Sequence, residues 1–188
     1  CGFLFAASIR LWYTQDYRRK MKEMKWKPAL DTWLVYLPAI GFFIIPALYI
    51  LTPLLAAADY TLPEWAGWAG AAIFAAALIL LWRSHADLGA NFTPVAAVQE
   101  GQRLVTTGVY CSIRHPMYAA HFLWAFAQPL LLWNWIAGFA LLITFIPLYY
   151  VRVPVEERML ADRFGEDYLE YMERTGRIIP KFTQPESP

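Results

Sequence analysis

Two groups of polar residues stand at either end of a long uncharged stretch of this sequence and could do chemistry there. Residues 114–118 (Arg-His-Pro-Met-Tyr) come just before it, and Arg152, Glu156 and Glu157 come just after it. No His, Cys, Asp or Glu cluster has metal-ligand spacing, and no serine nucleophile, dinucleotide or P-loop motif is present. What remains is a small set of cationic and acidic side chains beside an apolar segment. Such a set can bind a charged ligand, or it can only anchor helices at a membrane boundary.

The composition shows which elements must position these residues. Hydrophobic residues make up 59% of the chain and charged residues only 16%. No Lys or Arg occurs in residues 29–82, and no Asp, Glu, Lys or Arg occurs in residues 116–151. Long stretches without charge are typical of multi-pass membrane proteins. We therefore predict an all-α membrane helix bundle of about five spans, which forms a single domain over residues 1–188.

Three spans are expected in residues 1–82, at 2–13, 30–55 and 65–82. The first apolar run is too short to cross a bilayer, and with the start at Cys1 this predicts that part of that span is missing. Six Lys and Arg residues within 18–27 predict a cytoplasmic location, and the acidic turn 59–64 predicts the opposite side.

The uncharged stretch is expected to fold as a helical hairpin. A single helix over residues 117–151 would be about 50 Å long, well beyond a hydrocarbon core of about 30 Å. The sequence Trp133-Asn134-Trp135 in its middle predicts a turn. Both ends then emerge on the cytoplasmic face, which brings His115 and Arg152 together. Residues 83–188 thus comprise a long loop (84–114), this hairpin, and a C-terminal amphipathic helix that starts at Pro154 and breaks at Gly165.

Each polar residue also has a structural interpretation. Taken alone, Arg152 is more often an interfacial anchor, and His115 more often a capping residue. Glu156 and Glu157 would suit the first turn of any helix. Arg174 and Arg177 are expected to be solvated or to contact lipid headgroups, and residues from Lys181 onward are expected to form a loose tail. Only the joint spacing of Arg152, His115, Glu156 and Glu157 favours a functional site.

That joint spacing resembles a known family. The resemblance rests on these motifs: Gly108-Val109-Tyr110, residues 114–118, the uncharged hairpin, Arg152, Glu156-Glu157 and Phe164-Gly165-Glu166-Asp167-Tyr168. Together they resemble the isoprenylcysteine carboxyl methyltransferases and the related phospholipid methyltransferases, over about residues 84–180. The resemblance implies S-adenosyl-L-methionine as methyl donor and a lipophilic isoprenylcysteine-like substrate whose carboxylate accepts the methyl group.

The resemblance also implies roles for individual residues. Arg152 would hold the substrate carboxylate as the catalytic residue. The cofactor would be bound by Gln102, Arg103, Leu104, Val105, Tyr110, His115, Pro116, Met117, Tyr118, Glu156 and Glu157. One departure is Ala97, which stands near a glutamine used by animal members. A carboxylate is already ionised at pH 7 and needs no general base, so the enzyme would align the reacting atoms and exclude water. Free N–H groups at the start of the fourth span would suit the carboxylate of the cofactor.

Three alternatives remain open at this level. The chain could be a phospholipid (ethanolamine-type) N-methyltransferase, an NADPH-dependent sterol-type reductase, or a non-catalytic membrane scaffold. The expected partners are a lipophilic small molecule or a prenylated cysteine, together with membrane lipids, and neither nucleic acid nor metal is expected. The expected location is the cell membrane if the source is prokaryotic, with the catalytic face in the cytoplasm.

Overall fold

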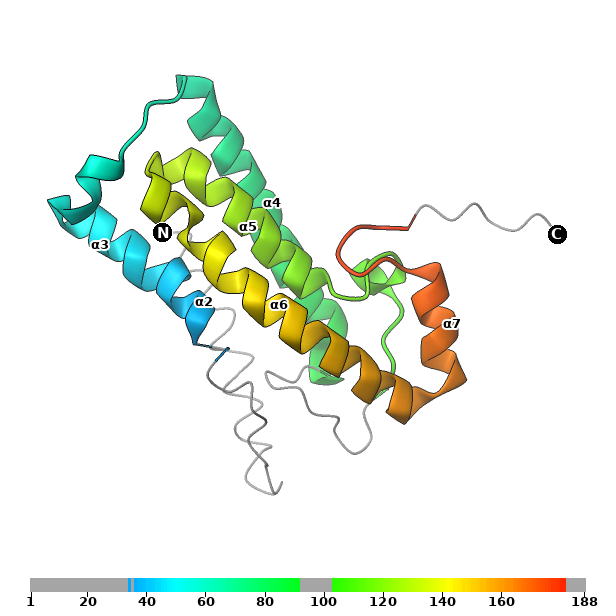
Figure 1. Cartoon of the computed structure of the whole chain (residues 1–188). Helices are drawn as coiled ribbons and strands as arrows, with labels where there is room; N and C mark the ends of the chain where they lie inside the picture. Colours follow the sequence, from blue (N-terminus) through cyan, green and yellow to red (C-terminus); the bar gives the residue numbers. More distant parts are fainter. Residues whose placement is uncertain (1–33, 35, 92–102, 182–188) are drawn as a thin grey trace. The chain divides into compact units, whose positions relative to one another are not determined.

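The computed structural model of the chain describes residues 34, 36–91 and 103–181 (Figure 1). Over these residues the regular structure is helical and contains no β-strand, which confirms the all-α prediction. The principal helices are α3 (Ile45–Leu51), α4 (Glu64–Leu88), α5 (Pro116–Leu132), α6 (Trp135–Phe164) and α7 (Glu166–Arg174). The predicted first span, the basic cluster, Gln102 and Ala97 lie outside the described residues.

The chain divides into two compact units. Among the described residues, the first unit comprises 80–91, 103–119 and 155–181, and the second comprises 34, 36–79 and 120–154. Helices α4, α5 and α6 each contribute to both units. The single-domain interpretation stays a prediction.

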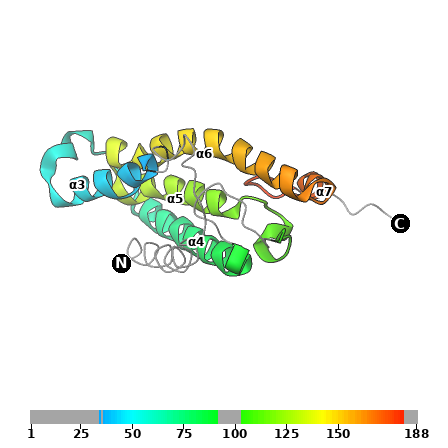
Figure 2. The same cartoon turned by 90° about the horizontal axis from the view of Figure 1, so that it is seen from below.

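In the second unit, α5 packs between α4 and α6 (Figures 1 and 2). The rings of Phe74 on α4 and Trp124 on α5 are 4.4 Å apart, and those of Phe122 on α5 and Phe145 on α6 are 5.1 Å apart. Among the described residues, α4 and α6 are long and apolar enough to cross a membrane. The prediction of about five spans stays a prediction.

Prolines shape the segment that leads into α3. The chain passes from α2 (Leu37–Ala39) through a π-helical turn (η3, Ile40–Ile44) into α3, and a 3₁₀ turn (η4, Pro53–Ala58) follows. The wide π turn precedes Pro46, which cannot donate a backbone hydrogen bond. Gln128 Nε2 on α5 donates to the Gly41 carbonyl of this turn at 3.0 Å and to the Ala137 carbonyl at 2.6 Å. A side chain at Gly41 would collide with Thr144, so only glycine permits this approach to α6.

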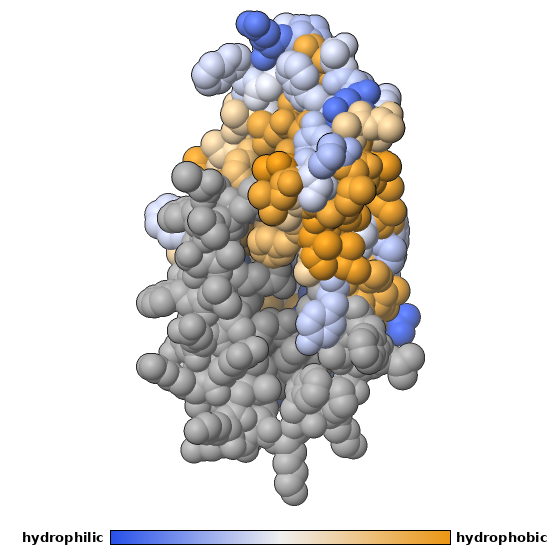
Figure 3. Space-filling model, turned by 90° about the vertical axis from the view of Figure 1, so that its left-hand side faces the viewer, coloured by the Kyte–Doolittle hydropathy of each residue, from blue (hydrophilic) through white to orange (hydrophobic). Residues whose placement is uncertain are grey.

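Large apolar side chains are exposed around α3. They are Ile40, Phe43, Ile44, Leu48, Ile50, Leu51 and Leu54. Figure 3 shows apolar residues gathered on the coloured part of one face. An exposed apolar area of this kind favours contact with lipid rather than water.

The turn between α5 and α6 lies where the sequence predicted it. Helix α5 ends at Leu132, α6 begins at Trp135, and Trp133 has a φ of 49°. The fully buried Asn134 caps α6, because its Oδ1 accepts the N–H groups of Ile136 at 3.0 Å and Ala137 at 2.8 Å. Its Nδ2 donates to the Leu55 carbonyl at 2.7 Å and to Asp59 Oδ1 at 2.8 Å. Asn134 therefore joins the hairpin turn to the segment after α3.

We expect Asn134→Ala to lower the free energy of unfolding by about 2–4 kcal/mol, since it removes the helix cap and leaves buried polar partners unpaired. Thermal unfolding in detergent measures the loss. Asn134→Asp keeps the cap acceptor but places a carboxylate against Asp59, so it should not restore stability. A fully stable Asn134→Asp variant would contradict this role of the amide.

Two predicted helix boundaries are wrong. Helix α4 continues to Leu88, so the loop starts later than residue 84. Helix α6 runs through Pro154 without a break. A proline removes one backbone hydrogen bond, and a long apolar helix packed against its neighbours can continue despite that loss. Arg152 and Glu156 consequently lie one turn apart on a single helix. The predicted break at Gly165 is confirmed, since it separates α6 from α7 with a φ of 56°.

Candidate functional site

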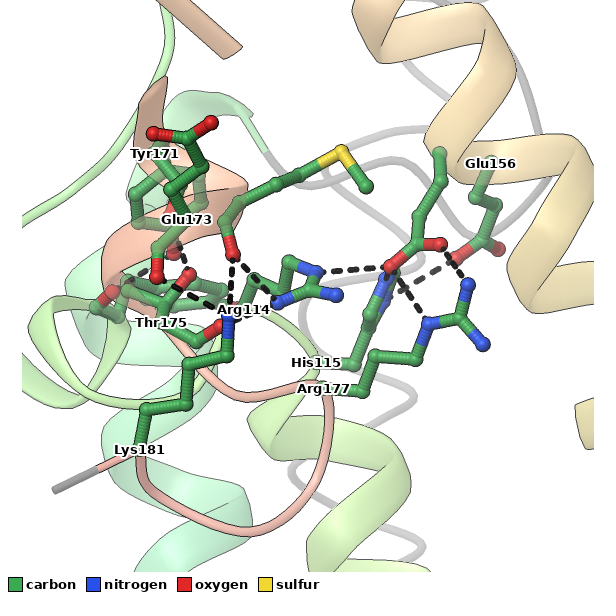
Figure 4. A network of polar contacts seen from close by, with 11 residues as sticks. Arg114, His115, Glu156, Tyr171, Glu173, Thr175, Arg177 and Lys181 are labelled. Carbon is green, nitrogen blue, oxygen red and sulfur yellow. Dashed lines mark hydrogen bonds and ion pairs between the residues drawn. The ribbon is translucent and has the colours of Figure 1, made fainter. Parts of the chain in front are cut away.

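The first unit gathers six polar residues at the start of α5, which we call the polar cluster. Figure 4 labels four of them, Arg114, His115, Glu156 and Arg177. The members of the polar cluster are Arg114, His115, Tyr118, Glu156, Glu157 and Arg177. They come from three places in the sequence: the entry to α5, the last part of α6, and the segment that follows α7. The predicted proximity of the 114–118 motif to the two glutamates is confirmed.

The carboxylate of Glu157 is the centre of the polar cluster. Its Oε1 accepts from Arg114 Nε at 2.8 Å and from Arg177 Nε at 3.1 Å, and its Oε2 accepts from Arg177 Nη2 at 2.6 Å. The side chains of Glu157 and Arg114 are only 6% and 8% exposed. Two guanidinium groups thus compensate one buried carboxylate, and charge-assisted bonds of this type are strong.

His115 lies between the two glutamates. Its Nδ1 is 3.9 Å from Glu156 Oε2, and its Nε2 is 3.4 Å from Glu157 Oε1. His115 is buried, and its Nε2 has no hydrogen-bond partner among the residues that the structure describes. The Tyr118 hydroxyl donates to Glu156 Oε1 at 2.9 Å. Tyr118 and Glu156, both half-buried, therefore form a polar pair beside an imidazole that retains hydrogen-bonding capacity.

The backbone at the start of α5 is held by residues after α7. The N–H groups of Arg114 and His115 donate to the carbonyls of Gly176 and Arg177, both at 2.9 Å, and the Gly176 N–H donates to the Ser112 carbonyl at 3.1 Å. The N–H groups of Arg114 and His115, which precede α5, are therefore occupied. The expectation that free N–H groups at the start of the span suit an anion stays a prediction. Arg177 was expected only to be solvated or to contact lipid headgroups. Its side chain is 48% exposed, and its guanidinium in addition binds Glu157.

The loop before α5 is fixed by Asp87 at the end of α4. Asp87 Oδ2 accepts the N–H of Val109 at 2.8 Å, and its Oδ1 is 2.9 Å from Arg83 Nη2. This positions the 3₁₀ turn η6 (Gly108–Cys111). Sequence reasoning did not find Asp87, although its i, i+4 spacing from Arg83 was a visible signal.

Tyr110 is packed inside the first unit. Its hydroxyl donates to the Ser84 carbonyl at 3.2 Å, and its own carbonyl accepts from the Tyr171 hydroxyl at 2.7 Å. Burial raises the pKa of Tyr110, and it also raises the pKa of Tyr171, so both phenols stay protonated as donors. Tyr110 thus connects α4 and α7 through the η6 turn.

The remaining predicted residues lie in several places. The Arg103 N–H donates to Asn91 Oδ1 at 2.9 Å, and Leu104 and Val105 are half-buried beside it in sequence. Pro116 and Met117 open α5, where the proline suits the first turn. Arg152 is 6% exposed and belongs to the second unit. Within the described ranges no three His, Cys, Asp or Glu side chains are grouped to hold a metal ion.

Comparison with known proteins yields consistent matches. Residues 68–162 match the model of the isoprenylcysteine carboxyl methyltransferase (ICMT) family. Over 94 residues, 49% of this chain, the sequence is 33% identical to protein-S-isoprenylcysteine O-methyltransferase B of Arabidopsis thaliana and 36% identical to protein-S-isoprenylcysteine O-methyltransferase of Homo sapiens. These alignments cover 48% and 33% of the two relatives, so the match spans half or less of each.

A solved structure is similar in fold. The structure of the eukaryotic intramembrane Ras methyltransferase ICMT aligns with a TM-score of 0.59 and 23% sequence identity, over 81% of this chain and 54% of that chain. The likeness supports the helical fold.

Proposed function

Since this chain belongs to the isoprenylcysteine carboxyl methyltransferase family, we propose that it is an integral membrane methyltransferase. It transfers a methyl group from S-adenosyl-L-methionine to the carboxylate of a lipophilic isoprenylcysteine-like substrate. The observation that carries this proposal is the polar cluster: the family match includes both the start of α5 and Glu156-Glu157 of α6, and these residues meet in the first unit. The names of the matched relatives supply the substrate class.

The residues of the polar cluster fit the proposed cofactor. A buried imidazole nitrogen without a hydrogen-bond partner in the described part of the chain is suited to a polar ligand. The Glu156 side chain is 21% exposed, and a carboxylate there can accept hydrogen bonds from an ammonium or a ribose. When bound, S-adenosyl-L-methionine supplies an electrophilic methyl group on a sulfonium.

The family-derived binding set is proposed to hold this cofactor. It comprises Gln102, Arg103, Leu104, Val105, Tyr110, His115, Pro116, Met117, Tyr118, Glu156 and Glu157. Within it we assign ligand contact to His115, Tyr118 and Glu156. Glu157 already accepts three hydrogen bonds from two arginines, so it acts chiefly by holding Arg114 and Arg177 around the site.

Arg152 is proposed to hold the substrate carboxylate. It lies one turn before Glu156 on α6, and residues four apart share one side of a helix. The carboxylate is ionised at pH 7, so no side chain has to remove a proton. The protein's own contribution is to orient that carboxylate and to keep water away from it. We place this site on the cytoplasmic face of a bundle of about five spans.

A binding and transfer experiment tests the function. The purified chain in detergent is titrated by calorimetry with S-adenosylhomocysteine and with NADPH, and transfer of radiolabelled methyl is then measured with an S-prenylated cysteine and with an ethanolamine phospholipid. We expect S-adenosylhomocysteine to bind and the methyl group to be transferred to the S-prenylated cysteine. Binding of NADPH alone would indicate a reductase, and transfer only to the phospholipid would indicate the N-methyltransferase alternative.

A further inference from the structure

We propose that Arg177 is a positioning residue of the transfer site, and that residues 175–181 form a clasp that holds the cofactor-binding residues in place. The inference rests on the proposed function and extends it to a segment that comes after every residue of the predicted site. Arg177 acts through Glu157 and His115 and does not itself touch the reacting atoms.

The backbone of the clasp is bonded to the entry of α5. Ile113 and Gly176 form a parallel bridge, and three N–H groups, those of Arg114, His115 and Gly176, donate across it. Arg114 and His115 precede α5, so their N–H groups have no partner within that helix and need partners outside it. The clasp supplies them, and it thereby sets the direction in which His115 enters the site.

Side chains attach the clasp at both of its ends. Arg114 Nη1 donates to the Thr175 carbonyl and, at 3.4 Å, to the Met172 carbonyl. Lys181 Nζ donates to the carbonyls of Met172 at 3.3 Å and Glu173 at 3.0 Å (Figure 4). The clasp is therefore tied both to the motif before α5 and to the last turn of α7.

Arg177 connects the clasp to the carboxylate of Glu157. Its side chain is 48% exposed, yet its two nitrogens reach the two oxygens of the buried Glu157 carboxylate. A carboxylate held through both oxygens cannot rotate, and a planar guanidinium provides this two-point contact whereas an ammonium group does not. Arg177 thus fixes the plane of the carboxylate whose Oε1 is 3.4 Å from His115 Nε2.

The test uses the full chain with Arg177→Gln and Arg177→Lys, and Arg174→Gln as matched control. Arg174 is an exposed arginine on α7 whose Nε contacts the Glu170 carbonyl of its own helix. We expect Arg177→Gln to lower kcat/KM by roughly tenfold to a hundredfold through misplacement of the cofactor-binding residues. The loss should appear chiefly in the KM for S-adenosyl-L-methionine. Arg177→Lys should recover only part of it, and Arg174→Gln should match the wild type.

Hydrogen exchange gives a readout independent of activity. The amides of Arg114 and His115 should exchange slowly in the wild type and faster in Arg177→Gln, with no change in Arg174→Gln. Unchanged kinetics and exchange in Arg177→Gln, or full activity of Arg177→Lys, would overturn the positioning role. A wild-type chain that transfers no methyl would instead refute the proposed function, and the exchange experiment would still decide whether the clasp is tied through Arg177.

Discussion

Arg152→Ala is expected to abolish methyl transfer while leaving the affinity for S-adenosylhomocysteine nearly intact. The proposed role of Arg152 is to hold the acceptor carboxylate, and removing a preorganised charge of this kind typically costs about a hundredfold or more in turnover. The proposed cofactor-binding groups His115, Tyr118 and Glu156 are expected to stay in place. Calorimetry reports the affinity, and transfer of radiolabelled methyl to an S-prenylated cysteine reports turnover.

Two further variants make this result interpretable. Arg158→Ala removes an exposed arginine from the same helix, so it should retain both binding and turnover. Arg152→Lys keeps the positive charge without the guanidinium geometry and should recover only a part of the activity. An equal loss of cofactor affinity and turnover in Arg152→Ala would show that Arg152 serves the cofactor or the fold rather than the acceptor.

Glu157→Gln should be the most destabilising single change in the polar cluster. It leaves the buried guanidinium of Arg114 without its carboxylate and weakens the attachment of Arg177 at the same time. Breaking a buried ion pair by removing one partner typically costs about 3–5 kcal/mol. We expect a clear fall in the midpoint of thermal unfolding in detergent, with loss of cofactor binding as a consequence.

The control for this variant is Glu170→Gln, which neutralises an exposed carboxylate on α7. It should change the unfolding midpoint little, since exposed charges contribute at most about 1 kcal/mol. If Glu157→Gln were as stable as Glu170→Gln, the two arginines would have adequate alternative partners, and the central role of Glu157 would be wrong.

The lengths of the uncharged runs and the positions of turn residues in the sequence were enough to predict much of the architecture. An uncharged run too long for one span requires a turn, and Asn134 between two tryptophans is a residue that can both turn the chain and cap the next helix. That turn sends α6 back antiparallel to α5 in the second unit. The meeting of Tyr118 with Glu156 in the first unit agrees with the same hairpin. Gly165 marked the break before α7 because its backbone conformation, with a φ of 56°, favours glycine.

Other boundaries were not predictable, because local signals competed with packing. Pro154 resembles a helix start in sequence, yet α6 passes through it with the loss of one hydrogen bond. The π turn at Ile40–Ile44 receives a hydrogen bond on its Gly41 carbonyl from Gln128, which is 87 residues away along the chain.

By itself, the sequence determined the helical class, the hairpin, and the gathering of the 114–118 motif with Glu156 and Glu157. These follow from the composition and from the positions of the polar motifs at the two ends of the uncharged hairpin. Only the tertiary structure decided that Arg177 binds Glu157, that Gly176 and Arg177 occupy the N–H groups before α5, and that Asp87 holds the turn before Tyr110. Each of these pairs joins polar groups that are distant in sequence. A charge or N–H that is removed from water needs a hydrogen-bond partner, and the tertiary structure decides which partner lies within reach.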